Sequence, residues 1–238
     1  MSRSEKVSAI EQAIADYSNT SSKAVKSSLI KKLRKFSISK YGLVSKELRA
    51  KVWPLILSID TTKLPPKPTR VKVRKNKWFN QVKLDVDRCI SRLPKNLPSD
   101  QTLVLQDNLI DLILHIMEAH PELNYYQGYH DITITILQVC GLRLAVPVAE
   151  KLTMSNLKDF MQETMDSTKL VLNLIFPIIS VADPELYYFL QMSEVGSYFA
   201  LSWLITWYGH VMKDLKRTSR IYDFFMASHP IIGHVFIY

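Results

Sequence analysis

The spacing of apolar residues is the feature that most restricts the fold of this chain. In residues 78–93, Phe79, Val82, Val86 and Leu93 form one apolar stripe at intervals of three, four and seven residues, which is the pattern of an amphipathic helix. Comparable spacing recurs along most of the 238 residues, and six glycines are few for a β-rich fold with many tight turns. The sequence therefore predicts an all-α protein with one continuous core.

We expect the first helices at about 5–17, 23–36 and 44–58, with the third ended or kinked by Pro54. A helix from Trp78 should stop at Pro94, and Asp100 is the expected N-cap of a longer helix that ends near His120.

Residues 132–136 alternate Ile and Thr, as a strand would. No partner strand with a hairpin signal lies nearby, so we interpret this segment as a buried helix. Further helices are expected at about 145–153, 155–164, 168–181, 184–193, 197–212 and 218–228, with a kink at Pro177.

The positive charge is concentrated near the N-terminus. Residues 1–77 contain 19 Lys/Arg and 5 Asp/Glu, whereas residues 78–238 contain 12 and 17. Part of this charge lies in a proline-containing connector, residues 63–77, which has no internal aromatic residue to stack a nucleic-acid base. The asymmetry suggests an anionic partner such as a membrane surface, and a solvated basic face is the alternative.

Several classes of function have little support in the sequence. Cys89 and Cys140 lack metal-ligand spacing and are expected to be free thiols in a reducing compartment. His120 and His130 have no third ligand nearby, so we do not expect a metal pair. A secretory signal and an apolar run of membrane-spanning length are both missing, which favours a soluble intracellular chain.

Two short stretches carry the side chains best suited to chemistry. Arg88 ends the stretch that begins at Asp85, and Gln127 lies in Tyr125-Tyr-Gln-Gly128. Arginine fits phosphoryl oxygens, and glutamine can accept from a water while it donates to a phosphate. The pair suits the aiming of a water at a phosphate that another protein holds. Taken singly, Arg88 could be a solvated ion pair and the second stretch a simple turn.

A third stretch, Arg49-Ala-Lys-Val-Trp53, places Arg49 and Trp53 on one helix face, where we expect a structural role with Arg49 bound to a carboxylate. The three stretches, in this order on a helical chain, resemble the TBC-domain GTPase-activating proteins that act on Rab GTPases. The resemblance begins near Gly42 and divides the chain into a basic helical extension, 1–41, and a TBC Rab-GAP domain, 42–238. Residues 124–131 and 200–207 look closest to a subgroup anchored in the endoplasmic reticulum that acts in early secretory traffic.

The resemblance implies that Arg88 is an arginine finger and Gln127 a glutamine finger, both supplied to the GTPase in trans. GTP and Mg²⁺ would then belong to the partner, so we expect no cofactor of the chain's own and no nucleotide site. Asp85 should orient Arg88 or tie its helix to the neighbouring loop. Tyr125 and Gly128 should fix the loop that presents Gln127, and Arg49 and Trp53 belong to the scaffold.

The sequence also departs from the family pattern. Val82 replaces the usual isoleucine, and Cys89 stands where the family commonly has threonine. The chain ends at Tyr238 without the family's further helices, so we expect a C-terminally truncated domain. A longer form with a membrane segment would lie on the cytoplasmic face of the endoplasmic reticulum or Golgi, and the chain would otherwise be cytosolic.

Two other functions are compatible with the sequence. A non-catalytic scaffold of the same fold could bind a GTPase or a membrane. A nucleic-acid binder through residues 23–77 is supported by charge alone, and we do not expect nucleic acid as a partner.

Overall fold

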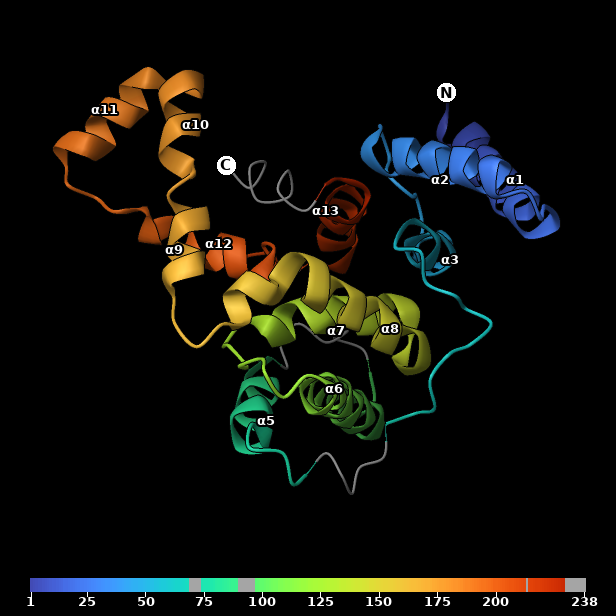
Figure 1. Cartoon of the computed structure of the whole chain (residues 1–238), viewed down its shortest axis with the longest axis horizontal. Coiled ribbons are helices and arrows are strands. Elements are labelled where there is room, and N and C mark those ends of the chain that lie inside the picture. Colours follow the sequence, from blue (N-terminus) through green and yellow to red (C-terminus); the bar gives the residue numbers. More distant parts are fainter. Residues whose placement is uncertain (69–73, 90–96, 213, 230–238) are drawn as a thin grey trace.

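The computed structural model describes residues 1–68, 74–89, 97–212 and 214–229 (Figure 1). All regular structure in these ranges is helical, which confirms the predicted all-α class. The expected helix end at Pro94 and the C-terminal residues 230–238 lie outside them. The α-helices are α1 (Arg3–Asn19), α2 (Lys23–Ile38), α3 (Lys46–Ile56), α5 (Phe79–Arg88), α6 (Ser99–Ala119), α7 (Tyr129–Cys140), α8 (Leu142–Leu152), α9 (Asp166–Leu172), α10 (Ile175–Ala182), α11 (Pro184–Met192), α12 (Leu201–Thr206) and α13 (Leu215–Ala227).

Helix α7 forms the centre of the core (Figure 1). It packs against α3, α5, α6, α8, α12 and α13, and all nine residues from Tyr129 to Leu137 are buried. The segment that alternates like a strand is therefore a helix, as we expected. Burial on every side removes the need for one apolar face. Thr133 and Thr135 satisfy their hydroxyl groups by donating to the carbonyl oxygens of Tyr129 and Asp131.

The basic N-terminal helices pack directly on the rest of the molecule. Helix α1 starts with a capping box made by Ser2 and Glu5 and lies along α2. Helix α2 contacts α3 and α13, and Arg34 donates to the carbonyl oxygens of Ile56 and Ala227 at 2.6 and 2.8 Å. These bonds link α2 to the end of α3 and the end of α13. The division of the chain into an extension, 1–41, and a domain, 42–238, stays a prediction.

Two predicted helices differ from the observed ones close to a proline. Helix α6 begins after Pro98, which makes no side-chain cap bond, and Asp100 lies in the first turn instead of at the cap. The predicted helix 168–181 is split into α9 and α10 at residues 173–174. Pro177, in the first turn of α10, has no N–H to bond the carbonyl oxygen of Asn173, so the helical bonding is interrupted and a new helix begins at Ile175.

Two other predicted helices are shorter than expected. Helix α12 stops at Thr206 because Trp207 and Tyr208 adopt left-handed backbone angles, with φ of 48° and 59°. The predicted helix 155–164 consists of a π-helical turn, Thr153–Leu157, followed by a 3₁₀ turn, Lys158–Met161. These two turns precede α9, and a third short turn, Ser197–Ala200, directly precedes α12.

None of the described helices is by itself long and apolar enough to cross a membrane. The pair Leu142–Met161 and Asp166–Ala182, bent by 99°, meets the length and composition criteria only when taken together.

Candidate functional site

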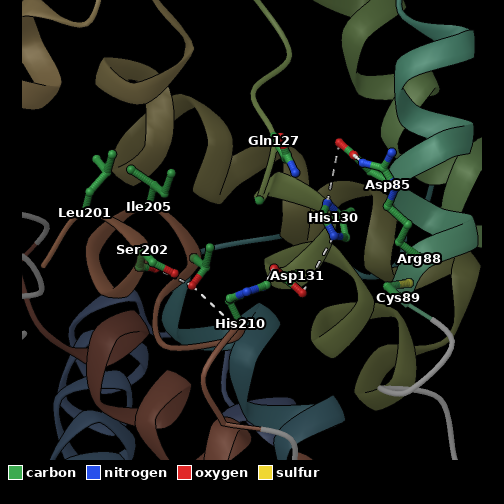
Figure 2. A pocket seen from close by; sticks show the side chains of 12 residues that line it. Asp85, Arg88, Cys89, Gln127, His130, Asp131, Leu201, Ser202, Ile205 and His210 are labelled. Atoms are coloured by element: carbon green, nitrogen blue, oxygen red, sulfur yellow. Dashed lines mark hydrogen bonds and ion pairs between the residues drawn. The ribbon is translucent and has the colours of Figure 1, made fainter. Parts of the chain in front are cut away.

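An open cavity of about 460 Å³ lies where three segments meet: the C-terminal end of α5, the loop before α7, and α12 with the residues that follow it. Arg88 and Gln127 both line this cavity (Figure 2). The two residues that the sequence singled out for chemistry therefore face one shared space, although they come from different elements. Leu201 and Ile205 of α12 supply an apolar wall.

Arg88 is the last residue of α5. The apolar side chains of Val82 and Val86 are buried, which fixes the helix against α6 and α7 and leaves Arg88 at its edge. The Arg88 side chain is 69% exposed, and its Nη1 is 3.9 Å from Asp85 Oδ1, beyond hydrogen-bond distance. The guanidinium group is thus placed by its helix but keeps its donors available for an external group.

Gln127 is exposed at the tip of the loop that precedes α7. Gly128 follows it with a φ of +117°, a conformation that L-residues rarely adopt. A Cβ atom at Gly128 would lie 2.9 Å from Cγ2 of Thr206. Glycine is required here both by the backbone angle and by the close approach of α12.

The loop that carries Gln127 is held on two sides by tyrosine hydroxyl groups. Tyr125 donates to Asp85 Oδ2 at 3.0 Å, and Tyr126 donates to the carbonyl oxygen of Ile205 at 2.8 Å. Burial raises the pKa of both tyrosines well above the ordinary value, so both remain neutral donors. Asp85 therefore ties α5 to the loop, which is one of the two roles that the sequence suggested for it.

Three further polar residues line the cavity beside this loop. The hydroxyl oxygen of Tyr125 is 3.3 Å from His130 Nδ1, and His130 Nε2 is 3.8 Å from Asp131 Oδ1. The other oxygen of Asp131 is 3.3 Å from Nδ1 of His210, which lies after α12 (Figure 2). Sequence reasoning weighed His130 as one of a metal pair, which it did not expect, and gave no role in the site to Asp131 or His210. The sequence signal that could have identified His130 and Asp131 was their position in the first helical turn after Gly128.

The other residues that the sequence considered as metal ligands or reactive thiols are His120, Cys89 and Cys140. His120 is the C-cap of α6, and its Nε2 is 2.8 Å from Glu150 Oε1. Within the described ranges no group of three His, Cys, Asp or Glu side chains is arranged to hold a metal ion. Neither cysteine forms a disulfide; Cys89 lines the cavity, and burial raises the pKa of the Cys140 thiol to about 12.

Arg49 and Trp53 lie in the core and do not line the cavity. Arg49 makes two hydrogen bonds of 2.9 Å to the two carboxylate oxygens of Asp223, and Trp53 Nε1 adds a third of 2.9 Å. The amide of Leu43 donates to the same carboxylate at 2.9 Å. Burial raises the pKa of Asp223, and these donors oppose the rise. The sequence predicted a carboxylate partner for Arg49 but could not indicate a residue 174 positions away.

The cavity is an open surface feature, and it presents the cationic fork of Arg88 and the amide of Gln127. Such a set can bind and polarise a phosphate and orient a water that an incoming molecule carries.

The chain matches a family model in its larger part. Residues 46–238 match the RabGAP-TBC model, described as the Rab-GTPase-TBC domain. The chain is 50% identical over 200 residues to TBC1 domain family member 20 of Bos taurus and 49% identical to its Homo sapiens counterpart, with 84% of this chain and 50% of each relative covered. It is 34% identical to GTPase-activating protein gyp10 of Schizosaccharomyces pombe, with 80% of this chain and 51% of that protein covered. The chain thus spans about half the length of these curated relatives.

A solved structure shares the fold. The crystal structure of the Ypt/Rab-GAP domain of Gyp1p superimposes with a TM-score of 0.59 and 15% sequence identity, and the match covers 95% of this chain and 83% of that one. The likeness supports the helical architecture independently of any side chain.

Proposed function

Because the chain belongs to the Rab-GTPase-TBC domain family, we propose that it accelerates GTP hydrolysis by a Rab-family small GTPase to which it supplies Arg88 and Gln127. One observation carries this proposal: the exposed side chains of Arg88 and Gln127 face the same open cavity from two separately anchored elements. A GTPase docked over the cavity would meet both side chains at once.

Arg88 would act on the charge that develops on the transferred phosphoryl group. Its planar guanidinium can donate two parallel hydrogen bonds to phosphate oxygens. Since the contact with Asp85 is too long for a hydrogen bond, Arg88 does not have to break one there to reach a phosphate. In well-studied GTPases an arginine supplied in trans raises the rate by about 10³–10⁵.

Gln127 would position the attacking water. Its amide oxygen can accept from the water while its amide nitrogen donates to the γ-phosphate. The two tyrosine hydroxyl bonds restrict the loop, so the side chain is presented with little backbone freedom to lose. In this proposal GTP and Mg²⁺ are held by the GTPase, and the chain is a catalytic partner without a nucleotide site of its own.

The proposal also includes a place of action. The resemblance to the anchored subgroup favours early secretory traffic at the cytoplasmic face of the endoplasmic reticulum or Golgi. The exposed lysines of α2 favour contact with an anionic membrane surface, because that helix contains six Lys/Arg and no acidic residue.

The test is phosphate release from a panel of GTP-loaded Rab proteins, with and without the chain. We expect at least one Rab to hydrolyse GTP faster at catalytic amounts of the chain. Binding to a GTP-loaded Rab with an unchanged hydrolysis rate would identify the scaffold alternative instead. A set of Rab proteins that neither binds nor responds would contradict both.

A further inference from the structure

We infer that His130 is a positioning residue that joins the supports of the two fingers by donating its Nδ1 hydrogen to the hydroxyl oxygen of Tyr125. Its kinetic consequence rests on the proposed function. The hydrogen bond itself is a property of the free protein and is testable without a GTPase.

The direction of this hydrogen bond follows from the number of protons available. Tyr125 has one hydroxyl hydrogen, which it donates to Asp85 Oδ2 at 3.0 Å, since a carboxylate can only accept. The raised pKa of Tyr125 means that the hydroxyl keeps this hydrogen. Its oxygen is then an acceptor, and His130 Nδ1 at 3.3 Å must be the donor.

His130 occupies the place where the supports of both fingers meet. It is buried in the first turn of α7, three residues after Gln127, and lines the cavity beside the loop. Its Nδ1 is also 4.0 Å from Asp85 Oδ2, and Asp85 lies one helical turn before Arg88. The hydroxyl of Tyr125 thus connects a carboxylate on α5 to an imidazole on α7.

A carboxylate lies near the opposite edge of the ring, beyond hydrogen-bond distance. His130 Nε2 faces Asp131 Oδ1 at 3.8 Å, and Asp131 in turn approaches His210 beyond α12. The hydrogen bond at Nδ1 and the burial of the ring give it a defined orientation, and a defined ring fixes the Tyr125 hydroxyl between α5 and α7. The consequence is that the spacing of Arg88 and Gln127 depends on His130, although His130 touches neither side chain in the contacts described.

The first experiment measures the proton directly. A long-range ¹H–¹⁵N correlation spectrum of the ¹⁵N-histidine-labelled chain, recorded near neutral pH without a GTPase, distinguishes the two ring nitrogens. The spectrum of His130→Asn identifies the His130 signals by their loss. We expect Nδ1 of His130 to carry a hydrogen, and a hydrogen on Nε2 alone would overturn the inference.

The second experiment uses a pair of matched substitutions. In His130→Asn the amide nitrogen stands as far from Cβ as Nδ1 does, so a donor to Tyr125 is retained, whereas His130→Leu has similar branching and no donor. We expect His130→Leu to lower the maximal stimulated hydrolysis rate about three- to tenfold, with the KM for the Rab unchanged. His130→Asn should restore the rate, and His115→Leu on α6 is the histidine control. Equal losses in His130→Leu and His130→Asn would contradict the inference.

A double-mutant cycle tests whether His130 acts through Tyr125. Tyr125→Phe removes the shared hydroxyl, so Tyr125→Phe/His130→Leu should be no slower than the slower single variant. If the rate of the double variant fell by the product of the two single losses, His130 would not act through Tyr125. Thermal unfolding of each variant shows that the comparison is made between folded proteins.

A readout without activity separates this inference from the proposed function. If the chain accelerated no Rab, the proposed function would fail, and the inference would be decided by backbone amide signals. His130→Leu should shift the amides of both Arg88 and Gln127, and His130→Asn should shift them far less. An unchanged Arg88 amide in His130→Leu would show that the two supports are not joined.

Discussion

Arg88 and Gln127 project from different kinds of support, one from a helix end and the other from a loop tip. If both act on the same phosphate, each is needed for the stimulated rate. We predict that Arg88→Ala and Gln127→Ala each remove most of the stimulated hydrolysis, by about 10²–10⁴ for Arg88, because the transition-state charge loses its partner. Single-turnover phosphate release measures the loss.

The matched control for Arg88→Ala is Lys83→Ala. Lys83 is also a cation on α5, and it pairs at 2.6 Å with Asp87 on the exposed face. Its removal should leave the stimulated rate unchanged and should alter the free energy of unfolding by no more than a few tenths of a kcal/mol. Arg88→Lys should recover little, because an ammonium group lacks the planar fork. Normal stimulation of GTP hydrolysis by the Arg88→Ala protein would contradict the assignment of Arg88 as the arginine finger.

Gly128 makes a second prediction at the scale of a single residue. Gly128→Ala should lower the free energy of unfolding by about 1–3 kcal/mol through backbone strain, with a further cost from the contact at Thr206. It should also lower the stimulated rate, because the same backbone presents Gln127. Denaturant unfolding and phosphate release, measured on one preparation, report the two effects.

Gly141 provides the comparison. It also has a positive φ, +70°, but a Cβ atom there would have no neighbour within 4 Å. Gly141→Ala should therefore lower stability while the stimulated rate stays normal. Gly128→Ala/Thr206→Ser, which removes the crowding methyl group, should be more stable than Gly128→Ala alone. Equal rates for Gly128→Ala and wild type would contradict a role for this turn.

Between elements, the buried carboxylate of Asp223 accepts hydrogen bonds from three residues. It joins α13 to α3 through Arg49 and Trp53 and to the preceding loop through Leu43. Arg49→Ala leaves the buried carboxylate without its cation and should cost about 3–5 kcal/mol of unfolding free energy. Urea unfolding followed by far-ultraviolet circular dichroism measures this change.

Two comparisons isolate the buried charge. Lys51→Ala, on an exposed position of the same helix, should change stability by less than about 0.5 kcal/mol. Arg49→Ala/Asp223→Asn should recover part of the loss, because the amide leaves no unpaired charge. A double variant less stable than Arg49→Ala would show that the carboxylate needs no cation here.

The elements could be predicted from the sequence where one physical signal dominated. The apolar stripe through Val82 and Val86 was sufficient to place α5, and the helix at residues 132–136 followed from the helical surroundings. The sequence predicted a kink at Pro177 where the structure has a break at residues 173–174, and it did not predict the end of α12 at Thr206. Trp207 and Tyr208 adopt left-handed backbone angles, which the spacing of apolar residues does not indicate.

For the molecule as a whole, the uneven charge has a measurable consequence. Lys31, Lys32 and Lys35 of α2 are exposed, and Figure 1 shows α2 well away from α5. A membrane bound at α2 would therefore leave Arg88 accessible. We predict that changing these three lysines to glutamine weakens binding to phosphatidylserine-containing vesicles about a hundredfold at low salt. Vesicle co-sedimentation measures the difference.

The control removes the same charge elsewhere. Lys151, Lys158 and Lys169 are exposed in the second half of the chain, and their change to glutamine should have a much smaller effect. Binding should also fall steeply with added salt and vanish on zwitterionic vesicles. Equal weakening by the two triple substitutions would show that net charge alone, and not the surface of α2, drives binding.

The site as a whole could be predicted only in part. Arg88 and Gln127 were identified because each stands in a short pattern with a chemical meaning. The sequence could not show that one cavity holds both, nor that Asp131 and His210 meet beside them from positions 79 residues apart. Such distant pairs are set by the packing of α7 against α12, and a local pattern does not contain this information.

The connection through Asp223 also constrains the order in which the molecule can form. Arg49 and Trp53 are separated from their partner by 174 and 170 residues, and Arg34 is 193 residues from Ala227. During synthesis, most of the chain leaves the ribosome before α13 is available. Until α13 is made, Arg34, Arg49 and Trp53 cannot donate to these acceptors and are hydrated by water, so closure of the core around Asp223 is a late, long-range step.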